Sequence, residues 1–453
     1  MKPSALTRIL LAAGLLLTAL PGQAETINLQ QAVEMSLAAD PRIKEREQLI
    51  QVAQGMVQEV EGEGGWRIRA NLFVGLAPQV EGGFYQDGAY SGTTPRSDAH
   101  DWNGVSDWTR LDFALIHPLY TFGKIQHYGE AAQGKVDISR GELQATQGDT
   151  VYQAKRAYFG YLTARDVRAF LEDMQMRLDK AIKSAERDLK EETGETRQAD
   201  LYALQTARGM IAKYVHQARA VEKISLDGLK ILIGVDMKSD LTVADERIEP
   251  VPFPQLDLAE FQARALQDRP EMLQLNAGLR ARRALVEAKK ADRLPDIYAG
   301  VIGQADYASQ RDRLDNPYVQ DAYNGYGVTP VVGIRWDSVF GAADARVNQA
   351  QAELEALNHK KAFAVLGIPY EVGEAYANAE ANFASQRDLA EGAAAARRWM
   401  VASLADFSAG IEGADKVAEA IRNYALTQTD YLRTINDYNM NVAQLARLTG
   451  ELK

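Results

Sequence analysis

The chain has 453 residues, of which 25% are charged and 46% hydrophobic, and its formal net charge is −11 at pH 7. This composition is typical of a folded protein with a sizeable core and argues against a disordered chain or a basic nucleic-acid-binding protein. The chain contains no cysteine, so its stability has to come from packing or assembly instead of disulfides.

The first 24 residues predict a secretory signal peptide. Lys2 and Arg8 precede an apolar stretch from Ile9 to Leu20, and small residues follow at Gly22 and Ala24. In the mature part, residues 25–453, no apolar run approaches the ~20 residues that a membrane-spanning helix needs. Any contact with a membrane is therefore expected to be made by strands.

Residues 25–234 are predicted to form a first structural repeat. Asn28 and Gln31 have the spacing of a helix capping box, in which two side chains satisfy free backbone N–H groups reciprocally. The short helix that follows is expected to end at Pro41, because proline is favoured in the first turn of a new helix. The next helix has apolar residues at seven-residue intervals, which favours coiled-coil-like contact.

Two segments of this repeat, at about 66–77 and 108–118, change the period of apolar residues to 2. Ten-residue strands with one apolar and one polar face suit a transmembrane β-barrel, although half-buried sheets of soluble proteins alternate in the same way. The connecting loop is long and rich in Gly, Asp and Tyr, as outer loops of barrels often are.

A long helix is predicted from Lys124 to Glu192, followed by a return helix from Asp200 to Gly234. At 1.5 Å per residue the long helix would extend roughly 100 Å, too far for a globular domain to bury it. On these helices alone, a coiled-coil spacer is the alternative interpretation. Apolar residues in the long helix step by 4 and 3, the 3.5-residue period of a left-handed supercoil, at Val167, Leu171, Met174, Leu178, Ala181 and Ala185.

Residues 256–453 repeat the same order after a proline-bearing linker, 235–255, which is expected to cross the middle of the molecule as a belt. The capping-box spacing returns at Asp257 and Glu260, and the proline returns as Pro270. Two copies this long indicate a duplication and not a solenoid array. The other expected elements are strands at about 295–306 and 327–337, a long helix from about Ala342 to Ser408 with a kink near Pro369, and a return helix from Asp415 to Gly450.

Four strands cannot close a barrel in lipid, because the open edges would stay unsatisfied and the smallest barrels have eight strands. The chain is therefore expected to assemble with other copies of itself. Cyclic symmetry is the simplest way to pool their strands.

The combination resembles the TolC-like outer-membrane efflux protein family over essentially the whole mature chain. The resemblance is carried by "INLQQAVEMSLAADPRI" and its echo "LDLAEFQARALQDRPEM", by "PLYTFGK", and by the helix-turn segments "TGETRQADLYALQTA" and "AGIEGADKVAEA". It implies a mainly α fold with a transmembrane β-barrel: a homotrimer whose twelve strands form one barrel in the outer membrane, continued through the periplasm by an α-helical barrel.

The resemblance also implies a function. The chain would be a passive exit duct and not an enzyme, and it would couple with an inner-membrane pump and a periplasmic adaptor to export small molecules or proteins. No cofactor or metal is expected, because the five histidines show no ligand spacing and no glycine-rich nucleotide loop follows a strand. The runner-up is a soluble periplasmic coiled-coil adaptor or scaffold without a barrel, and an exported enzyme has little support.

In this family the turns after the long helices form the periplasmic tip. Gly194 and Gly410 match the family's tip glycines, and Asp200 and Asp415 match the aspartates that follow them. Three copies of an aspartate around a constriction would select for cations. The alternative is that both aspartates are helix N-cap residues, a position that favours this residue type.

At two tip positions the residue differs from the one that the family's pattern has there. Glu412 stands where well-studied members have an arginine, so the ion pair that closes their gate would need another cation, either Arg197 or Lys416. Phe407 occupies the place of an aromatic tyrosine. It is expected to preserve part of the constriction as packing.

Overall fold

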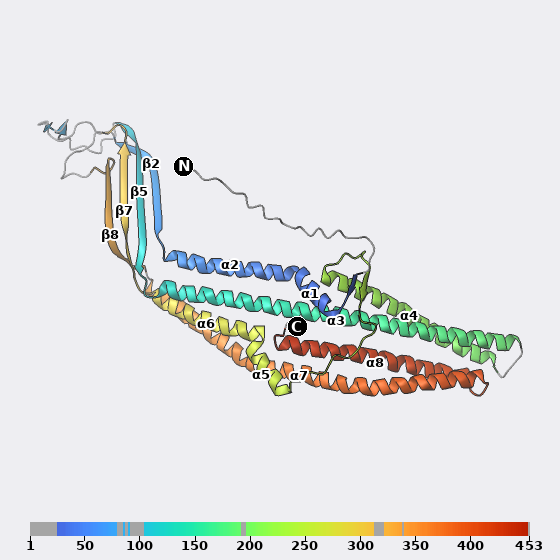
Figure 1. Ribbon diagram of the computed structural model, residues 1–453. Coiled ribbons are helices and arrows are strands. Elements are labelled where there is room, and N and C mark those ends of the chain that lie inside the picture. Colours follow the sequence, from blue (N-terminus) through green and yellow to red (C-terminus); the bar gives the residue numbers. More distant parts are fainter. Residues whose placement is uncertain are drawn as a thin grey trace, which may run out of the picture.

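The computed structural model describes residues 25–78, 85–86, 89–90, 104–191, 196–311, 321–337 and 339–451. The predicted signal peptide and Gly194 lie outside these ranges. Figure 1 shows a four-stranded sheet at one end of an elongated molecule, with long helices extending from it.

The elements follow the predicted order of helix, strand, strand, long helix and return helix, and they follow it twice. The first set consists of β1 (Glu25–Ile27), α1 (Leu29–Ala39), α2 (Pro41–Glu63), β2 (Arg67–Pro78), β3 (Tyr85–Gln86), β4 (Ala89–Tyr90), β5 (Val105–Tyr120), α3 (Lys124–Lys190) and α4 (Gln198–Ile233). The second consists of β6 (Leu241–Val243), α5 (Leu258–Asp268), α6 (Pro270–Ala291), β7 (Asp296–Ala308), β8 (Gly325–Arg335), α7 (Phe340–Ser408) and α8 (Ala414–Leu448).

The helix starts are built as the sequence predicts. Asn28 accepts from the Gln31 N–H at 2.9 Å, and Gln31 accepts from the Asn28 N–H at the same distance. Asp257 and Glu260 form the second capping box. Both prolines stand at the first position of a helix, Pro41 in α2 and Pro270 in α6.

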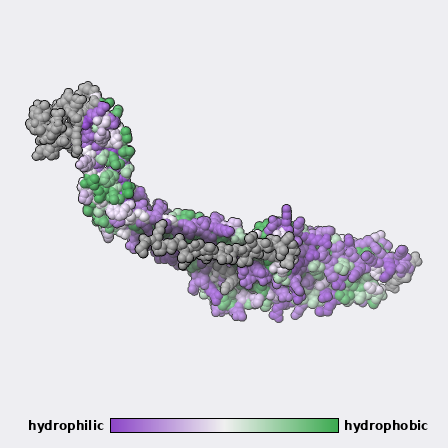
Figure 2. Space-filling model, turned by 45° about the horizontal axis from the view of Figure 1, so that its top comes forward, coloured by the Kyte–Doolittle hydropathy of each residue, from purple (hydrophilic) through white to green (hydrophobic). Residues whose placement is uncertain are grey.

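The long strands form one antiparallel sheet in the order β2-β5-β7-β8, so β5 and β7 join the two repeats. On one face, apolar side chains of the two edge strands are 63 to 79% exposed; they are Ile68, Leu72, Val74, Leu76, Val328, Val332 and Ile334. In Figure 2, green hydrophobic side chains gather over the strands, whereas purple ones dominate the helices. Within the part of the single chain that the structure describes, β2 and β8 each have one edge without a partner strand.

Each long helix is lined by shorter ones. α2, α1 and α4 contact α3, and they follow one another along it in Figure 1; α6, α5 and α8 contact α7 in the same manner. The predicted 3.5-residue stripe of α3 is confirmed, because Leu171, Met174 and Leu178 are buried in one hydrophobic cluster with residues of α4, α7 and α8. α7 continues through Pro369, whose carbonyl accepts from the Gln262 side chain at 3.0 Å; the kink stays a prediction.

The linker between the repeats is fastened to two helices. Its Asp245 accepts from the Tyr158 hydroxyl of α3, and its Ile248 N–H donates to Asp166 of α3 at 2.7 Å. Its Val251 N–H donates to Asn439 of α8 at 2.9 Å. Among the helices that the structure describes, none is both long and apolar enough to cross a membrane.

Asp40, the N-cap residue of α2, is buried and carries an ion pair across Pro41. It receives the Arg42 guanidinium at 2.7 Å and the Thr150 hydroxyl of α3 at 2.6 Å. These bonds, that from Arg42 first, lower the pKa of Asp40 to about 2 against the opposing effect of burial. The second repeat reverses the signs: Arg269 precedes Pro270 and pairs with Glu271 at 3.1 Å.

We expect Asp40→Asn to lower the free energy of unfolding by on the order of 2 kcal/mol at neutral pH, because asparagine keeps the cap but loses the charge. The pKa of Asp40 is lower in the folded chain than in the unfolded one. Its contribution is therefore complete above pH ~4 and is lost as the pH falls through about 2. Thermal unfolding followed by circular dichroism over this range measures the effect.

Asp257→Asn is the matched control, since Asp257 is an exposed N-cap residue outside any ion pair in the described part of the chain. A deficit in Asp40→Asn that stays constant between pH 7 and pH 2 would contradict this account of the Asp40 ion pair.

Candidate tip and docking groove

The end of α3 and the start of α4 lie at the same end of the molecule as the turn between α7 and α8, opposite the sheet (Figure 1). α7 ends at Ser408, and Gly410 then adopts a positive φ of 74°, a conformation that favours glycine. Phe407 is only 7% exposed and belongs to the hydrophobic cluster beneath the tip. It thus packs the end of the helical body, and its part in a constriction stays a prediction.

Asp200 joins the starts of α4 and α8. It is the third residue of α4 and is 5% exposed. One carboxylate oxygen accepts from the Arg197 N–H at 2.9 Å, and the other accepts from the N–H of Ala414, the first residue of α8, at 3.1 Å. One side chain therefore satisfies free N–H groups at the starts of two helices, each of which carries a partial positive charge there.

Neither tip aspartate is itself an N-cap residue, which corrects the alternative drawn from the sequence. The N-cap residues are Arg197 for α4 and Gly413 for α8. Aspartate is favoured at the start of a helix, so the sequence predicts a carboxylate near that position. In the structure, the carboxylate that accepts from the backbone N–H groups belongs to Asp200, the third residue of α4, and not to the N-cap residue. Asp415 is the second residue of α8 and is exposed.

Burial acts to raise the pKa of Asp200, but the N–H groups of Arg197 and Ala414 and the Arg197 guanidinium outweigh it, so the net pKa is lowered. The Arg197 side chain, 72% exposed, pairs with Asp200 at 3.2 Å. Lys416 instead pairs with Glu419 at 3.5 Å. Of the two cations considered from the sequence, Arg197 is the one that meets the first tip aspartate, and Glu412 lies partly buried in the second turn.

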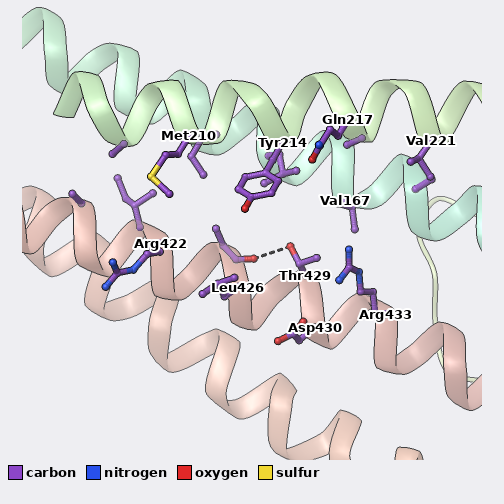
Figure 3. Close-up of a pocket in the computed structure, with 18 of the residues that line it drawn as sticks. Val167, Met210, Tyr214, Gln217, Val221, Arg422, Leu426, Thr429, Asp430 and Arg433 are labelled. Carbon is purple, nitrogen blue, oxygen red and sulfur yellow. Dashed lines mark hydrogen bonds between the residues drawn. The ribbon is translucent and has the colours of Figure 1, made fainter. Parts of the chain in front are cut away.

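A groove with a volume of about 1490 Å³ runs beside the tip where α3, α4 and α8 meet. Figure 3 shows Met210 and Tyr214 of α4 pointing toward α8, on which Leu426 lies. These three side chains are 45 to 57% exposed. Charged residues of α8 follow the groove, namely Asp415, Glu419, Arg422, Asp430 and Arg433.

This groove was not predicted from the sequence, although the pattern of apolar residues in α4 indicates it. One stripe of the helix is buried, through Leu204, Ile211 and Val215. A second apolar stripe, through Met210 and Tyr214, faces outward. A helix that packs only on its own partners needs one such stripe, so the second indicates a further contact surface.

The comparison with protein families and the comparison with solved structures both find outer-membrane proteins. The family model described as outer membrane efflux protein matches residues 263–451. No curated protein sequence matches the chain significantly.

Solved structures match nearly the whole chain. The outer-membrane channel OprN aligns with a TM-score of 0.75 at 18% identity and covers 93% of this chain and 90% of that one. VceC from Vibrio cholerae gives 0.74 at 12% identity, with coverages of 93% and 96%. The MtrE channel of Neisseria gonorrhoeae, in its open state, gives 0.69 at 17% identity, with coverages of 94% and 89%.

The chain therefore has the fold of outer-membrane channels, and its residues 263–451 match the family model described as outer membrane efflux protein. The resemblance to TolC-like outer-membrane efflux proteins is confirmed.

We expect Asp200→Ala to loosen the tip, because it leaves two N–H groups without their acceptor, each costing roughly 1–3 kcal/mol. Hydrogen–deuterium exchange at the starts of α4 and α8 should rise by about tenfold or more, while exchange in the middle of α3 stays unchanged. Asp415→Ala is the control, since Asp415 is exposed and its side chain makes no hydrogen bond with the residues that the structure describes. Equal exchange in the two variants would show that Asp200 does not hold the turns together.

Proposed function

We propose that the chain is the outer-membrane exit duct of an efflux or type I secretion system, acting as a homotrimer. The observation that carries this proposal is the sheet: one face is exposed and apolar, and neither edge has a partner strand among the described residues of the chain. Such a sheet is stable in lipid only when its edges are closed.

Three copies joined edge to edge would supply twelve strands, a number within the range of known transmembrane barrels. The apolar face would then meet lipid, and the face that carries Arg110, Asp112 and Gln304 would line a water-filled lumen. The helices of each chain would continue this wall into the periplasm. The long α3 and α7, with the shorter helices beside them, are arranged as such a continuation requires.

The groove beside the tip is the surface that we assign to the periplasmic adaptor. Its floor is apolar and its borders carry charges of both signs, which suits the amphipathic helix of a partner. An inner-membrane pump would complete the assembly. Asp415 is exposed at the tip end of the groove, and in a trimer it would recur three times around the opening of the lumen; a lower preference for K⁺ over Cl⁻ in Asp415→Ala channels is the corresponding test.

We expect the protein to be extracted from the outer-membrane fraction only by detergent, as trimers that separate into monomers on heating. Deletion of its gene should abolish export of the cargo. Quantitative release by osmotic shock as a water-soluble monomer would contradict the proposal and would favour the periplasmic adaptor or scaffold.

For the groove, we expect Tyr214→Asp to reduce export at least tenfold while trimers still form, because a charge is placed in the centre of an apolar contact. Ile231→Asp is the matched control: it makes the same change at an exposed position of α4 outside the groove. Normal export by Tyr214→Asp, at normal protein levels, would exclude the groove as the adaptor's docking site.

A further inference from the structure

The polar face of the sheet carries a basic hollow at the end nearest the helices. The hollow has a volume of about 370 Å³, and its charged lining residues are Arg67, Arg69, Arg335 and Glu63. The first two arginines come from β2, the third comes from β8 at the opposite edge of the sheet, and Glu63 ends α2.

The strand register places the three arginines on one face. Arg67 pairs with Ile116, Ile116 with Gly300, and Gly300 with Val331. Directly paired residues share a face, and every second residue along a strand returns to it. Arg69 therefore lies on the face of Arg67, and Arg335, four residues after Val331, does too. This is the face opposite the exposed apolar one.

The cations of the hollow outnumber their partners. Arg67 forms an ion pair with Glu63. Arg335 lies 3.1 Å from Asp296, but Asp296 also receives Lys124 at 2.8 Å. Arg69 is exposed and has no ion-pair partner among the residues that the structure describes. Each chain thus contributes a local excess of positive charge.

Farther along the sheet, the arginine on the same face lies close to carboxylates. Arg110 lies 3.0 Å from Asp112 and 3.9 Å from Asp306. The lumen wall therefore does not have a uniform excess of cations, and the unmatched charge is confined to the base of the sheet.

A neighbouring subunit would not remove this excess. Closing the barrel brings β8 of one chain beside β2 of the next. From Gly325 to Arg335, the residues of β8 on the lumen face are Gly325, Gly327, Thr329, Val331, Gly333 and Arg335, without a carboxylate. Asp337 lies beyond the end of the strand. In the trimer, each Arg69 would therefore gain another arginine nearby instead of an acid.

We infer that this ring of arginines is an anion-binding site in the lumen, at the junction of the barrel and the helical tube, and that it takes phosphate or carboxylate groups of solutes in transit. The inference rests on the proposed trimeric duct. Guanidinium groups bind such oxyanions through paired N–H donors, and rings of arginine or lysine favour anions in pores. Arg69, exposed and uncompensated, is the residue on which binding depends most.

The test uses the purified full-length trimer in planar bilayers at low salt, with inorganic tripolyphosphate added to the side of the long loops. We expect a concentration-dependent block of the wild-type current. Arg69→Gln should raise the half-blocking concentration about tenfold or more, and added KCl should do the same by screening. Arg335→Gln should have an effect in the same direction.

Arg208→Gln is the control for removal of one positive charge, since Arg208 lies on α4 and pairs with Asp179 far from the sheet. Channels that conduct but resist tripolyphosphate, or that are blocked equally before and after Arg69→Gln, would overturn the anion site and leave the duct intact. Failure of the purified protein to form conducting channels would instead count against the proposed function itself.

Discussion

The open edges of one four-stranded sheet are the constraint on which the rest of the structure depends. β2 and β8 each leave a row of backbone N–H and C=O groups without a partner strand in the segments that the structure describes, and one face of the sheet is apolar and exposed. In water the apolar face is unfavourable, and in lipid each unpaired backbone group costs several kcal/mol. Copies of the chain that join edge to edge within a membrane, as we propose, would remove both costs together.

The helices of one chain extend from the end of the sheet, as the continuation of such a closed cylinder would require. The two repeats are joined at the sheet by the β5–β7 pairing, in the middle by the linker that binds α3 and α8, and at the far end by Asp200. These contacts hold the two repeats of one chain together at three positions along its length. The proposed lumen would have an excess of arginine at the base of the sheet, whereas exposed side chains of both signs, Asp415 and Arg197, lie at the tip.

Much of this architecture is local enough to be predicted from the sequence. The capping boxes, the prolines at the first helical positions and the 3.5-residue stripe of α3 depend on neighbours a few residues away, and the structure confirms them. The bond from Ala414 to Asp200 joins residues 214 positions apart, and no local pattern indicates it. The basic hollow was missed for a similar reason, since only the pairing order of the strands brings Arg335 to the face of Arg67. The tip aspartates were found through the family resemblance, whereas the outward stripe of α4 was visible in the sequence and was overlooked.

Cysteine cross-linking between the edges of the sheet tests the central claim most directly, because the chain has no cysteine of its own. Within one chain β2 and β8 are separated by two strands, roughly 14 Å, which is beyond the ~7 Å reach of a disulfide. Leu72→Cys can be combined in turn with cysteine at Val328, Val332 or Ile334, and any disulfide formed must then join different chains. The account predicts covalent dimers and trimers in native outer membranes for at least one combination and none for the single variants. Monomers alone, for every position tested along β8, would contradict it.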